Sequence, residues 1–510
     1  MSFLKRNFLL FVVFITGAAV LVVEVVAIRI LAPYFGNTIF SVSSILGVIL
    51  AALSVGYYIG GTLADKHPSL KWFFGIILAS GISIFILQFL IMFVLPFLSR
   101  SFSIIYGPLV SSIVLFFIPS FLLGTLSPFA IKLQEALSPN VGIGTISGKI
   151  FFWSTFGSIF GSLFSGFVLI PNFGLWQIMV GTGLVLVFMS IFALIVLNIK
   201  KGIIFGVIFS VFVMFLMIAL FQSFYFKENV VYAKDGIYGK IIIMDVIYEN
   251  RPARLFIQDR SLWGGVFLDS EDHAFEYSKY YSLYRITNPE MKRALVIGGG
   301  IYTIPKSIAQ ELPNAIVDVV EIEPSFFDLA KEFFGLKDYA NLNNFIQDGR
   351  RFLADSENKY DLIYGDAYSS LFSVPSHLTT IEFFEVVRDK LNNDGIFIAN
   401  IIGNLNPAPL SLLFSEMKTF RTVFPNSYFF AVDSKEKIKA QNIIFVGYKG
   451  DDKIDFLDER IAGKLAPLIV DLDKKMIDTD KIDFSRYMEL TDNFCPVDYL
   501  TAQTLKNQKF

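Results

Sequence analysis

The sequence contains little cysteine, histidine or charge for a chain of 510 residues. Its single cysteine, Cys495, excludes an internal disulfide framework and a cysteine-rich metal site. The three histidines, His67, His273 and His377, do not have the spacing of metal ligands, so we expect no metal. The net charge is −2 and no basic stripe is present, which argues against nucleic acid as the main partner.

Apolar residues, in contrast, are abundant and gather in the first half of the chain. The composition is 54% hydrophobic and only 17% charged, which indicates membrane spans. Because further spans follow the first apolar segment, that segment is a membrane helix and not a cleaved signal peptide. We predict a multi-pass helical domain over residues 1–226, lying in the lipid bilayer of the cell membrane. About seven segments are long enough to span it: 8–31, 39–63, 72–98, 104–129, 150–170, 175–197 and 202–224.

The charges of the short loops indicate how this domain is oriented. Positive residues gather on alternate loops, at positions 5, 6, 66, 71, 132, 149, 200 and 201, whereas the opposite loops hold little besides Arg100. The positive-inside rule then places the N-terminus in the cytoplasm. Seven spans would carry the second half of the chain to the other side, away from cytosolic nucleotide donors. The side of that half stays open.

Two features of the membrane half leave a transport or sensing role open. Glu24 and Arg29 are ionisable residues within the first span, and such residues are costly in lipid and often functional. The stretch 56–66 resembles the short cytoplasmic loop of major-facilitator transporters, in which a glycine-rich helix end meets an aspartate and a cation. Small residues at this spacing also simply allow helices to pack closely.

The composition changes abruptly at Lys227 and Glu228, where we place the start of a soluble half. Apolar and polar residues alternate over much of 227–290, which predicts a small antiparallel β-subdomain followed by a connecting helix. Strand and helix patterns then alternate over 291–450, which is typical of a parallel, doubly wound α/β sheet, and 451–510 form a C-terminal extension. The predicted strands are 294–298, 315–321, 344–347, 361–365, 395–402, 427–432 and 442–448.

The first of these strands ends in three glycines, Gly298, Gly299 and Gly300. Glycines at such a turn let the backbone approach a bound nucleotide, because no Cβ stands in the way. Glu321 lies 21 residues after Gly300, at the end of the next strand, where α/β nucleotide folds place the carboxylate that holds ribose hydroxyls. The combination predicts a site for an adenosine-containing ligand.

Polar residues also follow other predicted strands, at Asp348, Asp366 and Asn400. The carboxyl ends of parallel strands form the edge at which open α/β sheets bind ligands. Asp348, followed by Gly349, has an alternative interpretation as the N-cap of the helix that begins near residue 350.

Four motifs resemble the spermidine synthase family, and its membrane-fused branch in particular. They are GGGIYTIP at 298–305, VEIEP at 320–324, HLTTIEF at 377–383 and LTDNFCPVD at 490–498. The resemblance covers about residues 258–446, and the membrane half lies outside it. It implies a class I methyltransferase-like fold and the transfer of an aminopropyl group from decarboxylated S-adenosylmethionine, a co-substrate, with no tightly bound cofactor.

The resemblance also implies roles for individual residues. Gly298, Gly299, Gly300 and Gly349 would approach the donor, Glu321 would bind its ribose hydroxyls, and Asp348 would read the adenine amino group. Asp366 would deprotonate the attacking amine, a small acceptor such as putrescine. Gln258, Tyr277, Tyr368 and His377 are the candidate substrate-binding residues, and we expect a homodimer.

Two departures from the family pattern keep alternatives open. The family has an aspartate after the three glycines, which grips the amine of the donor, and here that residue is Ile301. A second aspartate usually follows the catalytic one three residues later, and here it is Ser369. One alternative is a methyltransferase that uses S-adenosylmethionine itself. Another is a transporter or sensor that binds a nucleoside or polyamine without catalysis.

Overall fold

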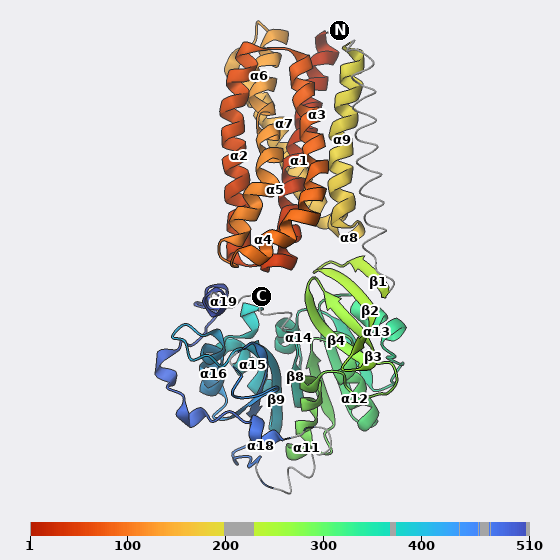
Figure 1. Ribbon diagram of the computed structural model, residues 1–510, viewed down its shortest axis with the longest axis vertical. Coiled ribbons are helices and arrows are strands. Elements are labelled where there is room, and N and C mark those ends of the chain that lie inside the picture. Colours follow the sequence, from red (N-terminus) through yellow and green to blue (C-terminus); the bar gives the residue numbers. More distant parts are fainter. Residues whose placement is uncertain are drawn as a thin grey trace. The chain divides into compact units, whose positions relative to one another are not determined.

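The computed structural model describes residues 2–197, 229–367, 374–437, 439–456, 458, 469 and 471–505 (Figure 1). The chain forms two compact units, and the boundary between them falls at Asn229. The first unit is entirely helical in its described part, and the second contains two β-sheets. This arrangement confirms the predicted fold class, a helical membrane-type domain followed by an α/β domain.

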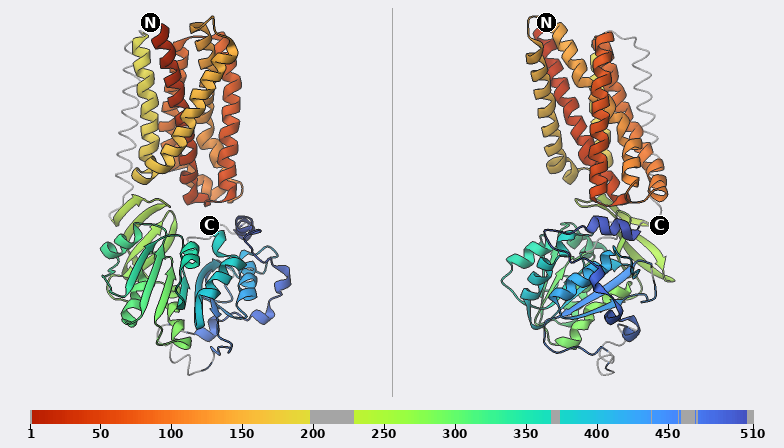
Figure 2. Two further views of the ribbon diagram at one scale, coloured as in Figure 1. Left: turned by 180° about the vertical axis from the view of Figure 1, so that it is seen from behind. Right: turned by 90° about the vertical axis from the view of Figure 1, so that its left-hand side faces the viewer.

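In the first unit the long helices run alongside one another, as all three views show (Figures 1 and 2). The described residues contain six helical segments that are long and apolar enough to cross a membrane: Asn7–Phe35, Ile39–Lys66, Leu70–Ser101, Gly107–Leu137, Ile143–Asn172 and Leu175–Val196. They correspond to the first six predicted spans. The seventh, 202–224, lies outside the described residues. The helices are α1 (Ser2–Phe35), α2 (Ile39–Lys66), α3 (Leu70–Phe89), the π-helical turn η1 (Leu90–Val94), α4 (Leu95–Ser101), α5 (Gly107–Gly124), α6 (Leu126–Leu137), α7 (Ile143–Phe164), η2 (Ser165–Leu169), α8 (Ile170–Asn172) and α9 (Leu175–Val196).

Glycines allow these helices to pack with their backbones close together. A Cβ added to Gly17 of α1 would lie 2.2 Å from the carbonyl oxygen of Ser154 in α7. Cβ atoms added to Gly56 and Gly60 of α2 would lie 2.4 and 2.5 Å from backbone oxygens of Phe121 and Thr125. These distances are shorter than real Cβ contacts, so only glycine fits. The glycines of the transporter-like stretch 56–66 therefore have a packing role.

The acid of that stretch also has a local partner. Asp65, at the end of α2, forms an ion pair with Lys132 of α6 at 3.3 Å, and Lys132 lies at the same distance from Glu135. All three side chains are exposed to a substantial degree, so the pairs contribute little stability. They join the ends of two neighbouring helices.

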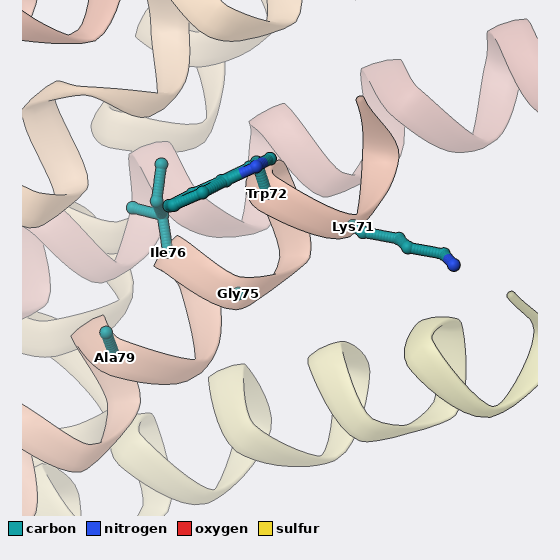
Figure 3. Close-up of a pocket in the computed structure, with 5 residues that line it drawn as sticks. All are labelled: Lys71, Trp72, Gly75, Ile76 and Ala79. Carbon is teal, nitrogen blue, oxygen red and sulfur yellow. The ribbon is translucent and has the colours of Figure 1, made fainter. Parts of the chain in front are cut away.

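A shallow depression lies along one side of α3 (Figure 3). Its lining residues are Lys71, Trp72, Gly75, Ile76 and Ala79, which share one face of the helix because they recur every three to four positions. Lys71 extends away from Trp72 and Ile76 in this view. Lys71 is the one ionisable side chain among these lining residues.

The second unit begins with a four-stranded antiparallel sheet in the order β1-β2-β3-β4. The strands are β1 (Val230–Asp235), β2 (Lys240–Tyr248), β3 (Arg251–Gln258) and β4 (Ser261–Phe267). Glu249 and Asn250 form the two-residue turn between β2 and β3, both with positive φ, as hairpin turns of this length require. This sheet is the predicted β-subdomain. The 3₁₀ helix η3 (Glu276–Leu283) and α11 (Tyr284–Thr287) connect it to the next sheet.

The larger sheet has seven strands in the order β10-β11-β9-β8-β5-β6-β7. The strands are β5 (Arg293–Ile297), β6 (Ile316–Glu321), β7 (Leu342–Ile346), β8 (Tyr360–Gly365), β9 (Leu391–Gly403), β10 (Asn426–Ala431) and β11 (Gln441–Tyr448). All seven predicted strands are present. The prediction of a parallel sheet is confirmed for β5 to β9, whereas β11 pairs antiparallel with both β9 and β10.

Alternate residues of the central strands point into two separate cores, one on each face of the sheet. In β5, Ala294 and Val296 belong to one core, and Leu295 and Ile297 to the other. The remaining helices cover these faces and the C-terminal part: α12 (Thr303–Glu311), α13 (Phe326–Phe333), α14 (Gly349–Asp355), η4 (Ser376–Leu378), α15 (Ile381–Lys390), α16 (Leu412–Val423), α18 (Leu472–Lys475), η5 (Thr479–Lys481), η6 (Phe484–Arg486) and α19 (Val497–Leu505). Burial on both faces explains why these strands are continuously apolar in sequence.

Candidate active site

The glycine turn after β5 is held in a conformation that few residues other than glycine adopt. Gly298 has φ +94° and Gly300 has φ +52°. The N–H of Gly298 donates to the carbonyl of Val320, at 2.9 Å, which ties the turn to β6. A Cβ added to Gly298 would lie 2.4 Å from the carbonyl oxygen of Asp366, whereas one added to Gly300 would have no atom within 4 Å. The turn therefore packs against the residue after β8 and leaves open space at Gly300.

Glu321, the last residue of β6, holds this turn in place. One carboxylate oxygen accepts hydrogen bonds from the N–H groups of Gly299 (2.8 Å) and Gly300 (3.1 Å), and the other accepts from Glu323 N–H (2.9 Å). Burial raises the pKa of Glu321, and these N–H donors oppose that rise. The ribose-binding role of Glu321 stays a prediction, but the contact with the glycine turn is part of the fold.

Asp366 directly follows β8 and lies beside the turn. Its N–H donates to the carbonyl of Ile297 at 2.8 Å, and its Oδ1 accepts from Asn400 Nδ2 at 2.8 Å. Asn442 Nδ2 in turn donates to Asn400 Oδ1 at 2.9 Å. Burial raises the pKa of Asp366 to about 6, with a further increase from the Glu321 charge, while the Asn400 hydrogen bond lowers it. A carboxylate with this pKa is a better base than an ordinary one and is still mostly ionised near neutral pH.

A narrow cavity of about 30 Å³ lies between the glycine turn, β4 and η3, and Asp366 is part of its wall. Its apolar walls include Trp263, Phe275, Tyr277 and Ile301. The Tyr277 hydroxyl donates to the carbonyl of Trp263 at 3.1 Å, so this aromatic wall is fixed in place. A nucleoside-sized ligand requires the walls of this cavity to separate.

Thr303 also lines the cavity, and its hydroxyl oxygen is buried without a hydrogen-bond partner. A buried hydroxyl normally finds a partner, so this atom marks a position where a polar group of a ligand would be favourable. Sequence reasoning missed Thr303, Trp263 and Phe275, although Thr303 belongs to the glycine motif that it singled out.

Asp348 and His377 form a second group next to the turn, at the end of β7. Asp348 Oδ1 accepts from Arg351 N–H at 2.9 Å, which makes it the N-cap of α14, and its Oδ2 contacts His377 Nε2 at 3.0 Å. A Cβ added to Gly349 would lie 2.3 Å from Ile297 Cγ2, so α14 starts tightly against β5. The alternative interpretation of Asp348 as a helix cap is therefore observed. Its adenine-reading role stays a prediction.

The C-terminal motif LTDNFCPVD contacts the segments that carry Asp348 and His377. Arg350 forms two hydrogen bonds with the Asp492 carboxylate, at 2.7 and 2.5 Å, and a third with the carbonyl of His377 at 2.9 Å. Thr380 donates to Asp492 Oδ1 at 2.8 Å. The tail thus fastens the segment that carries His377 to the start of α14.

The remaining predicted site residues are placed as follows. Gln258, at the end of β3, is buried, and its Oε1 has no hydrogen-bond partner; a Cβ added to Gly239 would lie 2.9 Å from its Nε2. The N–H of Tyr238, in the same β1–β2 turn, donates to Glu323 at 3.2 Å, so this turn packs beside the end of β6.

Tyr368 lies outside the described residues. Within the described part of the chain, no group of three or more histidine, cysteine or acidic side chains could hold a metal ion.

Comparison with known proteins agrees with this geometry. Residues 282–437 match the spermine/spermidine synthase domain family. The chain carries a spermidine synthase-like domain. The domain contains the glycine turn, Glu321, Asp348 and Asp366, and its identification confirms the predicted family resemblance.

Several polyamine aminopropyltransferases are similar in sequence. The enzyme of Vibrio vulnificus is 25% identical over 232 residues, which cover 43% of this chain and 76% of that protein. The probable polyamine aminopropyl transferase of Bifidobacterium longum is 28% identical, and only 46% of its length is covered. Polyamine aminopropyltransferase 2 of Aquifex aeolicus is 22% identical over 402 residues, which cover 76% of this chain and 77% of that protein. This match is longer than the second unit, Asn229–Gln508. These relatives support the prediction that the chain is a transferase.

Among solved structures, a probable spermidine synthase from Corynebacterium glutamicum has a TM-score of 0.44 and 18% identity, and covers 51% of this chain and 96% of that one. A spermidine synthase in complex with the transition-state analogue AdoDATO has a TM-score of 0.36 and 19% identity, and covers 47% of this chain and 78% of that one.

Proposed function

We propose that the protein is a membrane-anchored aminopropyltransferase. It moves an aminopropyl group from decarboxylated S-adenosylmethionine to a small amine, with putrescine as the reference acceptor, and Asp366 is the base. The observation that carries the proposal is the position of Asp366, next to the glycine turn and with a pKa raised to about 6. The similarity to polyamine aminopropyltransferases supports the same reaction.

The reaction needs orientation and proton removal more than it needs acid catalysis. The amine nitrogen forms a bond to the carbon beside the donor sulfonium, the carbon–sulfur bond breaks, and its electron pair neutralises the sulfur to give methylthioadenosine. The nitrogen becomes more acidic as it attacks, and its proton goes to Asp366. Asn400 keeps the carboxylate turned toward the cavity by donating to its other oxygen. Gly298, Gly299, Gly300 and Glu321 hold the adenosyl part.

The six apolar helices support anchoring in a membrane. The proposal places the protein in the cell membrane as a multi-pass protein, with a small amine as its partner. The homodimer stays a prediction. The chain has no tightly bound cofactor in this proposal, because the donor is consumed as a substrate.

Donor binding separates this function from methyl transfer. S-adenosylmethionine carries an additional carboxylate, which would share the cavity with the Asp366 charge, and like charges in a partly buried site repel strongly. Calorimetry on the full chain in detergent is expected to show at least about tenfold tighter binding of decarboxylated S-adenosylmethionine. Equal or tighter binding of S-adenosylmethionine would favour a methyltransferase. Binding of neither donor would contradict the proposal and favour transport or sensing.

One observation favours the methyltransferase as the second candidate. Ile301 stands where the family has the aspartate that grips the donor amine, and its side chain lies against Gly264 of β4, where an added Cβ would be 3.0 Å away. An apolar side chain here neither attracts the amine of one donor nor repels the carboxylate of the other.

Asn442 is expected to act as a positioning residue for Asp366. In Asn442→Leu, the Asn400 amide loses the partner that fixes its direction, so the hydrogen bond to Asp366 weakens and the pKa of Asp366 rises. We expect kcat to fall about tenfold and the acidic limb of the pH profile to move to higher pH. Tyr448→Phe is the control, because it removes a hydrogen bond to Asp394 at the other end of β11. An unchanged pH profile in Asn442→Leu would contradict this role.

A further inference from the structure

The contacts of the C-terminal motif LTDNFCPVD centre on Asp492. Its carboxylate accepts two hydrogen bonds from Arg350 and one from the Thr380 hydroxyl, at 2.8 Å. Its N–H donates to Glu382 at 3.0 Å. The motif lies beyond residue 437, where the spermidine synthase-like domain ends. The reaction proposed above uses none of these residues.

The strand order gives the direction in which a donor lies along the edge of the large sheet. The strands β8, β5, β6 and β7 are neighbours in that order, and Asp366 follows β8, Glu321 ends β6 and Asp348 lies just beyond β7. Neighbouring strands lie about 4.8 Å apart, which is roughly the distance between a ribose and its base. Since the proposed function places the reacting carbon at Asp366 and the ribose at Glu321, it places the base beside the end of β7.

Asp348 is the acid at that position, and both of its oxygens are held. Oδ1 accepts from Arg351 N–H at 2.9 Å, and Oδ2 contacts His377 Nε2 at 3.0 Å. The side chains of Asp348 and His377 are 36% and 48% exposed, so a ligand can reach them. Each carboxylate oxygen has a second lone pair, so Asp348 can also accept a hydrogen bond from the amino group of a base.

Arg350 connects His377 to the tail. It donates to the carbonyl of His377 at 2.9 Å and to the two carboxylate oxygens of Asp492 at 2.7 and 2.5 Å. Arg350 lies only two residues after Asp348, and an arginine without another acid would pair with that carboxylate. Asp492 therefore engages the arginine that would otherwise compete for Asp348, and it fixes the segment that carries His377.

We propose that the C-terminal tail is part of the donor site, with Asp492 and His377 as positioning residues that hold Asp348 ready for the amino group of the donor base. This inference rests on the proposed aminopropyl transfer and names what selects its donor. A carboxylate that is already fixed at both oxygens loses little side-chain entropy when the base binds. Without Asp492, Arg350 competes with the base for the same carboxylate.

The test measures how strongly the protein distinguishes adenine from a purine that lacks the amino group. Calorimetry on the full-length protein in detergent compares methylthioadenosine, the nucleoside product, with its analogue that has hydrogen in place of the 6-amino group. We expect methylthioadenosine to bind wild type at least about tenfold more tightly, because the analogue leaves Asp348 without this partner. In Asp492→Ala and His377→Ala the ratio should fall to about two to three.

Turnover gives a second measurement on the same variants. In Asp492→Ala the KM for the donor should rise about five- to tenfold, whereas kcat at saturating donor should change much less. Asp483→Ala is the control, since Asp483 lies in the same C-terminal extension and its hydrogen bonds with Ser485 and Arg486 stay within its own turn. It should keep the wild-type ratio. His377→Gln should restore most of the ratio, because a glutamine amide can donate the same hydrogen bond.

The outcomes separate this inference from the proposed function. If wild type binds both nucleosides equally, or if the Asp492 and His377 variants keep the wild-type ratio, the inference is wrong, and continued release of methylthioadenosine leaves the proposed function standing. If neither nucleoside binds and none is released from the donor, the proposed function fails and the inference fails with it. His377 is half exposed, so His377→Ala is expected to fold and decides the matter even where Asp492→Ala does not fold.

Discussion

Asp366→Asn is expected to reduce aminopropyl transfer by a factor of about 10² to 10⁴, the usual contribution of a positioned general base. Asparagine has nearly the same shape and can keep a hydrogen bond with Asn400, but it cannot accept a proton from the amine. Donor binding should change much less than kcat, because the glycine turn and Glu321 remain. The measurement is kcat by methylthioadenosine release, with donor affinity by calorimetry.

The pH dependence of the wild-type protein follows from the same carboxylate. Burial raises the pKa of Asp366 to about 6, so the base is protonated and inactive below that value. Activity should rise through about pH 6 and then level off, and Asp366→Asn should abolish this limb. A wild-type rate that is constant from pH 5 to pH 8 would contradict the role of Asp366 as base.

Asp366 also affects stability, and the sign can be worked out. Its pKa in the folded protein, about 6, lies above the ordinary value of 3.8, so the folded state favours the protonated form. The corresponding stability is present at low pH and is lost as the pH rises through about 6. Removing the charge should therefore stabilise the protein above about pH 7, by at most about 3 kcal/mol.

Asp361 provides the matched control at the other end of β8. Its carboxylate is buried and accepts hydrogen bonds from Lys292 N–H (2.7 Å), Arg293 N–H (3.0 Å) and Asn392 Nδ2 (2.6 Å). Asp361→Asn should lower the unfolding temperature and leave kcat of the folded protein near that of wild type. Asp366→Asn is thus expected to lose activity without losing stability, and Asp361→Asn to lose stability without losing activity. A general effect on folding cannot produce both results.

Gly298→Ala is expected to have the second largest effect. The backbone at Gly298 has φ +94°, which L-residues rarely adopt, and the new methyl group would lie 2.4 Å from the carbonyl oxygen of Asp366. The clash is with backbone, so the turn must move away from Asp366. We expect a loss of about 2–4 kcal/mol in the free energy of unfolding and the loss of most activity.

Gly300→Ala separates conformation from crowding. Gly300 has φ +52°, but an added Cβ would have no atom within 4 Å. The expected cost is only about 1–2 kcal/mol, the price of a left-handed conformation for an L-residue. The measurement is denaturant unfolding together with turnover. If both variants are equally stable and active, the turn does not pack on Asp366 as described.

Most of the sheet could be predicted from the sequence because buried strands leave a strong pattern. Each predicted strand, such as 361–365, overlaps an observed one, here β8. This pattern does not indicate the direction of β11, since an apolar strand has the same pattern in either direction. Only about nine residues separate β10 from β11, which is too few for a parallel crossover. The length of this connection therefore indicates an antiparallel pair.

The candidate site could be predicted where a characteristic sequence spacing links its residues, and not where the fold alone brings distant residues together. The glycine turn and Glu321 could be found from spacing alone. Asn442 could not, because its partner Asn400 is diagonal to it across the β9–β11 pair. Asp348 had two interpretations in sequence, and the backbone N–H of Arg351 shows that it caps a helix.

The most direct test of the proposed function is a competition between the two donors. Full-length protein is given equal amounts of decarboxylated S-adenosylmethionine and S-adenosylmethionine with putrescine as the acceptor, and the nucleoside products are identified by mass spectrometry. The proposal predicts methylthioadenosine, formed in step with an aminopropylated amine and absent in Asp366→Asn. S-adenosylhomocysteine as the main product, or methylthioadenosine release that Asp366→Asn does not change, would contradict it.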